Sequence, residues 1–74
     1  MIELSNGTKM SPESIVDGSL FIKGSVHGNN LVYVIFGILK ILQISYVISS
    51  HLTFDEAKEA INQINLAMDN ILTS

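Results

Sequence analysis

The sequence predicts a small α+β domain, with an antiparallel sheet of three to four strands covered on one face by a C-terminal helix at about residues 54–72. Short apolar segments separated by turn-forming residues between positions 19 and 48 are typical of antiparallel strands. Apolar residues at every third or fourth position of the last segment are typical of a helix with one buried side. Because 74 residues are too few for two hydrophobic cores, we expect residues 1–74 to form a single domain.

The first predicted element is a short hairpin over residues 2–10. Asn6-Gly7 readily adopts the positive φ angles of a two-residue turn. Such a turn would pair Leu4 with Lys9, and this pairing would mix apolar and polar side chains on both faces of the hairpin. A wider loop, or no hairpin at all, therefore stays open.

A single helical turn is expected next. Ser11, Pro12 and Glu13 have the order of a helix start, with a serine cap, a proline in the first helical position and an acid near the positive end of the helix dipole. Asp17-Gly18 interrupts the pattern soon afterwards. We therefore expect this turn not to continue into a longer helix.

The strand with the clearest pattern is predicted over residues 19–26. Ile22 and Val26 fall on one face of it, because successive side chains of a strand point to opposite sides. The next residues, His-Gly-Asn-Asn at positions 27–30, are dense in turn formers. They should reverse the chain into a second strand at residues 31–36.

Residues 31–48 form a long apolar run that has two interpretations. As one helix the run would span about 27 Å, close to the ~30 Å hydrocarbon core of a bilayer. However, eight of these eighteen residues are valine or isoleucine, which suit strands, and the second half alternates as a half-buried strand does. We therefore predict two strands joined near Gly37 to Lys40, and the membrane helix is the alternative.

The C-terminal helix has both a start signal and an apolar stripe. Thr53 and Glu56 form a capping box, in which the Thr53 hydroxyl accepts a hydrogen bond from a first-turn amide and Glu56 reaches back. The following apolar residues are spaced by three or four positions. They are Phe54, Ala57, Ile61, Ile64, Met68 and Ile71.

Composition favours self-association. The chain is 47% hydrophobic and has no cysteine, so disulfides cannot compensate for a small core. Residues 31–36 are apolar on both sides of a strand and need cover on both, yet one helix can cover only one face. We therefore expect a homo-oligomer that forms through the other face of the sheet or through an edge strand.

Charge disfavours nucleic acid as a partner. The net charge is −3, and the basic residues are four scattered lysines with no arginine, so no basic stripe can form. The N-terminal residues lack the pattern of a basic region followed by an apolar segment that marks a signal peptide. A cytoplasmic location is therefore expected, and a membrane association through residues 31–48 is less favoured.

The polar residues that could take part in binding or chemistry are His27, Asn29, Ser49, Ser50 and His51. The histidines lack partners at metal-ligand spacing, and no serine lies in a nucleophile elbow, so we expect no catalytic residue, metal or cofactor. These five residues are nevertheless candidates for an interaction or ligand surface. Ser49 and Ser50 precede the helix and could meet an anion there.

The functional prediction is a non-catalytic interaction protein that works as a homo-oligomer, such as a small regulator or inhibitor that binds another macromolecule. It rests on the lack of any recognisable catalytic arrangement. Two alternatives stay open. One is a single-span membrane peptide with its span at residues 31–48. The other is a protein that sequesters a small ligand in a pocket between subunits, near the five residues named above.

Overall fold

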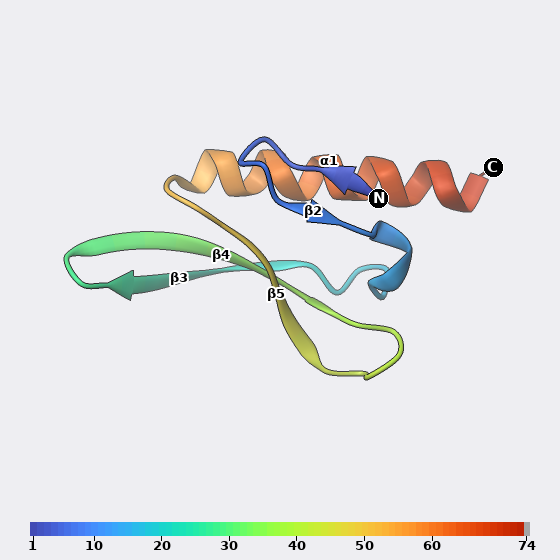
Figure 1. The fold of residues 1–74 in the computed structure, drawn as a ribbon, viewed down its shortest axis with the longest axis horizontal. Coiled ribbons are helices and arrows are strands. Elements are labelled where there is room, and N and C mark those ends of the chain that lie inside the picture. The colour runs from blue at the N-terminus through green and yellow to red at the C-terminus, as the bar shows by residue number, and fades with distance from the viewer. Residues whose placement is uncertain (74) are drawn as a thin grey trace.

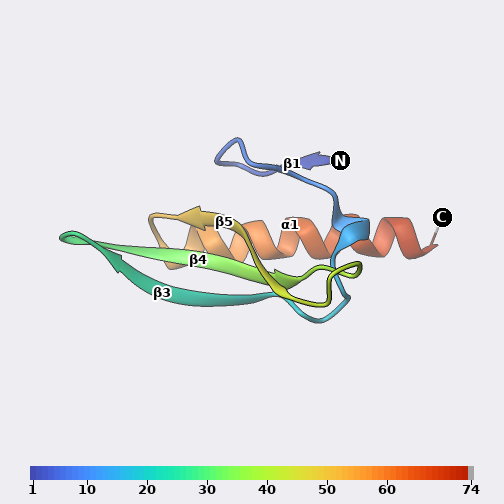
Figure 2. The same cartoon turned by 60° about the horizontal axis from the view of Figure 1, so that its bottom comes forward.

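The computed structural model of the protein describes residues 1–73 and has the predicted α+β architecture. A main sheet has the strand order β3-β4-β5 with antiparallel pairs, and a single helix packs along one of its faces (Figure 1). A second, two-stranded sheet lies beside the helix (Figure 2). The elements in order are β1 Ile2–Glu3, β2 Lys9–Met10, the 3₁₀ turn η1 Pro12–Ser14, β3 Phe21–His27, β4 Asn30–Ile38, β5 Ser45–His51 and α1 Phe54–Thr73.

The β3–β4 hairpin forms where it was predicted. Its register pairs Phe21 with Phe36 and His27 with Asn30, which leaves Gly28 and Asn29 as a two-residue loop. Gly28 has a φ of +64°, whereas Asn29 does not have a positive φ. A positive φ at the first loop residue alone is the pattern of a type II′ turn, whose twist matches that of the two strands.

Residues 31–48 form parts of two strands and the turn between them, so their interpretation as one helix is wrong. The turn between the strands was also predicted too early, because β4 continues through Gly37 to Ile38 and the chain reverses at residues 39–44. Gln43 adopts a φ of 56° in this reversal, and its backbone N–H donates to the Leu39 carbonyl at 2.8 Å. In the part of the chain that the structure describes, no helix is long and apolar enough to cross a membrane.

A β-bulge changes which residues of β5 point inward. Ile35 pairs with Ser49, whereas its neighbour Phe36 pairs with Val47, so Ile48 is an extra residue in β5. Simple alternation places Ile48 and Ser49 on opposite faces. With the bulge both are buried beside Ile35, and this part of the predicted pattern is wrong.

The hydrophobic core lies between α1 and the main sheet. Ile35 and Ile64 are fully buried at its centre, and Ala57 and Ala60 let the helix come close to the strands. The remaining buried members come from the sheet, the helix and the N-terminal segment. They are Leu4, Ile15, Ile48 and Met68.

The N-terminal hairpin has the wider of the two loops considered. Ile2 pairs with Met10, and residues 4–8 form the loop between β1 and β2. The side chain of Asn6 donates to the Ser50 carbonyl in β5 at 3.0 Å. The side chain of Gln63 in α1 donates to the Glu3 carbonyl at 2.9 Å, so the hairpin is tied to both the sheet and the helix.

Two predicted caps differ in outcome. Thr53 Oγ1 accepts a hydrogen bond from the Glu56 amide at 3.1 Å, as predicted, but among the described residues no return bond from the Glu56 side chain is formed. Ser11 precedes η1 without a side-chain capping bond. Its carbonyl instead accepts from the Ser14 hydroxyl at 2.6 Å, because a 3₁₀ turn brings residues three apart close together.

Candidate interaction surface

The structure brings two of the five predicted site residues into direct contact. Ser49 and His51 follow the bulge in β5 and point to the side of the sheet that α1 covers. The Ser49 hydroxyl lies 2.9 Å from Nε2 of His51. The two side chains are only 5% and 4% exposed, so the hydrogen bond compensates two polar groups that are buried in the core.

The other three predicted residues lie elsewhere. His27 and Asn29 are exposed at the tip of the β3–β4 hairpin, and His27 is within 3.3 Å of the Ser25 hydroxyl. Ser50 is exposed on β5, and its carbonyl accepts the bond from Asn6. Because β4 separates β3 from β5, the five residues do not form one site within a single chain. A pocket between subunits stays a prediction.

The Ser49–His51 pair has the contact distance of a nucleophile and its general base. Both groups are closed off by the core, however, and neither lines any of the three cavities described below. Among the described residues, no group of three or more histidine and carboxylate side chains could hold a metal ion. The geometry therefore favours a structural role for this pair.

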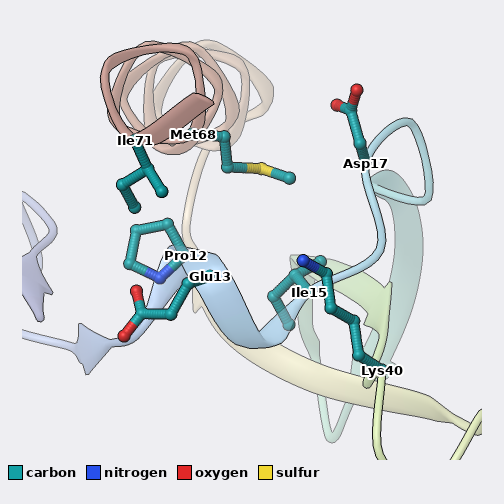
Figure 3. Close-up of a pocket in the computed structure, with 7 residues that line it drawn as sticks. All are labelled: Pro12, Glu13, Ile15, Asp17, Lys40, Met68 and Ile71. Atoms are coloured by element: carbon teal, nitrogen blue, oxygen red, sulfur yellow. The ribbon is translucent and has the colours of Figure 1, made fainter. Parts of the chain in front are cut away.

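One cavity lies between η1 and the end of α1 (Figure 3). Pro12 and Ile15 from the N-terminal segment face Met68 from the helix, and the charged side chains of Asp17 and Lys40 lie at the rim. Its volume is about 50 Å³. Ligand pockets have about 300–1,000 Å³, so this cavity has room for water and not for a metabolite.

A larger groove of about 470 Å³ runs between the N-terminal hairpin and β5. Met10 and Leu39 line it with apolar surface, and Lys9 is the charged residue along it. Tyr46 and Val47 form its side toward β5. None of the five residues predicted from the sequence lines this groove.

The most unusual feature of the molecule is the face of the main sheet that points away from α1, which we call the uncovered face. The odd-numbered residues of β4 point toward the helix, since Ile35 lies in the core and the Tyr33 ring meets the Phe54 ring edge-on at 5.7 Å. The even-numbered residues therefore point the other way. With their paired neighbours, the apolar residues of the uncovered face are Phe21, Val32, Val34, Phe36, Ile38 and Val47. Among them Phe21 and Val47 are exposed, whereas Val34 is only 8% exposed.

An aromatic stack lies on the uncovered face. The rings of Phe21 and Phe36 are stacked with centroids 5.2 Å apart and an interplanar angle of 13°. Phe21 is nevertheless 47% exposed, and Val47 on the other side of Phe36 is 50% exposed. The ionisable groups of β3 on this face are Lys23 and, at the tip of the hairpin, His27, and the part of the surface around the aromatic stack is largely apolar.

The turn at residues 39–44 adds further apolar surface at the end of β4 and β5. Ile41 is 91% exposed and Leu42 is 60% exposed, and they line a hollow of about 260 Å³ with Leu39 and Ser14. Exposed apolar residues that occur singly are normal, whereas a contiguous group of them marks an interaction site.

The sequence contained a signal for this surface, but the signal lay in the apolar residues 31–36 and not in the five polar residues named as candidates. A strand that is apolar on both sides needs cover on both, and residues 31–36 have this pattern. The structure places cover on one side only. The exposure of the turn at residues 39–44 had no comparable signal, because an apolar run does not reveal where it reverses.

Comparisons of the chain with protein-family models, with curated proteins and with solved structures found no match.

Proposed function

We propose that this protein is a non-catalytic interaction protein that works as a homo-oligomer and binds another protein through its uncovered face. The stack of the half-exposed Phe21 ring on Phe36, with the half-exposed Val47 beside it, carries the proposal. Aromatic and aliphatic side chains held in place by a sheet lose little conformational entropy on binding, so they are effective contact residues. A small regulator or inhibitor needs no more than such a surface.

The chemistry of the uncovered face indicates the kind of partner that fits it. Its centre is apolar, and hydroxyl groups of Ser25, Ser45 and Ser50 are distributed along its strands. This arrangement of apolar centre and polar border is usual for protein interfaces. The single positive charge of Lys23 cannot neutralise the several phosphates that a nucleic acid presents. A cytoplasmic location stays a prediction from the sequence.

A comparison of two lysine variants tests the proposal. Val47→Lys places a charge on the uncovered face, whereas Leu66→Lys places the same charge on the outer side of α1, where Leu66 is 65% exposed. Immobilised wild-type protein and the Leu66→Lys variant should retain the same protein from an extract of the source cells. The Val47→Lys variant should retain at least tenfold less of it, because an unpaired charge would be buried at the contact.

Titration of the retained protein, once purified, should reproduce this ranking of affinities. Equal retention by both variants would contradict a role for the uncovered face. Retention of no specific protein by the wild type would contradict the proposed function itself.

A further inference from the structure

β3 is an open edge of the main sheet. The sheet order places β3 and β5 at its two edges. In Figure 2, β3 lies along the border of the molecule, and no other element is drawn beyond it. An edge strand presents a row of unpaired N–H and C=O groups to any strand that approaches, so natural proteins usually protect such edges.

The opposite edge has that protection. β5 carries the bulge at Ile48, which bends the strand and interrupts a regular ladder. Its Ser50 carbonyl is also occupied by the Asn6 side chain of the N-terminal hairpin. β3 has seven residues in regular register with β4 and no bulge. Only one of the two edges is therefore suited to pairing with a further strand.

The hairpin register identifies which groups of β3 point outward. In a two-residue hairpin the residues that flank the loop, here His27 and Asn30, form a hydrogen-bonded pair. Such pairs alternate along an antiparallel ladder. The N–H and C=O groups of Ile22, Gly24 and Val26 therefore point away from β4. No hydrogen bond to another element reaches these three residues in the described chain.

We propose that a second copy of this chain pairs with β3 in antiparallel orientation, so that one continuous sheet crosses both copies. The outward-pointing groups are symmetric about Gly24, which would face Gly24 of the second copy. Ile22 would face Val26 of the second copy on each side. A two-fold axis through this point gives about six main-chain hydrogen bonds and a closed dimer.

The side chains fit this register. On the uncovered face Lys23 would lie opposite Ser25 of the second copy, and Phe21 would lie opposite His27, so no like charges face each other. On the covered face Val26, which is 70% exposed in the single chain, would lie against Ile22. Two β-branched side chains across a strand pair stabilise it, and the apolar surface of Val26 leaves water.

The dimensions of the single chain also suit a subunit. A monomer of 8.1 kDa is expected to expose about 4,500 Å², and this chain exposes 4900 Å². Its Cα radius of gyration is 12.3 Å, against about 11 Å for a typical domain of this length. The excess of surface and the extended shape are expected for a chain that buries part of its surface against a copy.

Substitution of Gly24 tests the pairing. Gly24→Pro removes an N–H that points away from β4, so the fold should survive while pairing is blocked, because proline is tolerated at such edge positions. Gly24→Ala is the matched control, since its added Cβ would lie 3.7 Å from Leu31 Cδ1, an ordinary contact, and the N–H stays. Light scattering should give twice the mass of 8.1 kDa for the wild type and Gly24→Ala, and the single mass for Gly24→Pro.

Amide exchange in the wild type provides a second test that needs no variant. The Gly24 amide should exchange at least tenfold more slowly than the exposed turn amide of Gly28 at concentrations where the dimer forms. A wild-type monomer, a dimeric Gly24→Pro variant, or equal exchange at the two glycines would overturn the inference.

This inference rests on the homo-oligomer part of the proposed function, and the two can fail separately. A monomeric wild type that still loses its partner through Val47→Lys would overturn the dimer and leave partner binding in place. A dimer that requires the Gly24 amide but binds no protein would support the pairing and contradict the proposed function.

Discussion

Gly37 shows how a single residue sets the distance between β4 and the core. A Cβ at this position would lie 2.7 Å from Ile48 Cδ1, 3.0 Å from Ile15 Cγ2 and 3.2 Å from Leu20 Cδ2. These distances are shorter than normal contacts and all three atoms belong to side chains, so an added Cβ would force the Ile48 side chain to move and would press on Ile15 and Leu20. Glycine therefore serves close packing here. In the sequence, a glycine within an apolar run also suggests a turn, but the turn lies at residues 39–44.

Gly37→Ala should therefore lower the free energy of unfolding by about 1–3 kcal/mol, the usual cost of overpacking. Gly24→Ala is the control, because its Cβ has room and alanine restricts the unfolded chain more than glycine does. Urea unfolding at one protein concentration measures both. An unchanged midpoint for Gly37→Ala would contradict the packing described here.

The buried pair of Ser49 and His51 was also misread at the residue level from sequence alone. Both residues precede a helix, where exposed polar residues are common, and nothing local indicates burial. The bulge at Ile48 decides the outcome, because it turns Ser49 to the same side as Ile48. A bulge depends on how two strands pair, and a single strand's alternation cannot reveal it.

At the scale of elements, α1 was predicted most closely. Its start at Phe54 follows from the Thr53 cap, and the spacing of its apolar residues predicted the buried Ala57, Ile64 and Met68. The two ends of the predicted stripe, Phe54 and Ile71, are instead 47% and 44% exposed. The cap and the spacing are local signals, so they can be read without knowledge of the tertiary structure. The β3–β4 hairpin was predicted for the same reason, because the turn-forming residues Gly28 and Asn29 make up its loop.

Removal of the cap should weaken α1. Thr53→Ala leaves the Glu56 amide without its side-chain acceptor and should lower the free energy of unfolding by about 1 kcal/mol, whereas Thr53→Ser keeps the hydroxyl and should recover most of it. Thermal unfolding followed by circular dichroism measures the difference. If alanine and serine variants had the same stability as the wild type, the Thr53 hydroxyl would not be a functional cap.

At the scale of the whole molecule, the sheet has one face covered by its own helix and one that the chain leaves half exposed. The sequence predicted this imbalance from residues 31–36, since one helix cannot cover both sides of a strand. It could not show which apolar residues come together, because Phe21 and Phe36 meet only through the hairpin register. The candidate surface is therefore a property of the tertiary structure.

Two phenylalanines provide a matched pair of probes for this central claim. Phe21 on the uncovered face and Phe54 on the helix side are both 47% exposed. Hydroxyl-radical footprinting reports side-chain exposure, so the two rings should be oxidised to similar extents in the Gly24→Pro variant, which the proposed β3 pairing does not cover. After addition of the partner retained by the wild type, oxidation of Phe21 should fall several-fold while that of Phe54 stays constant. Protection of Phe54 alone, or of neither ring, would contradict binding through the uncovered face.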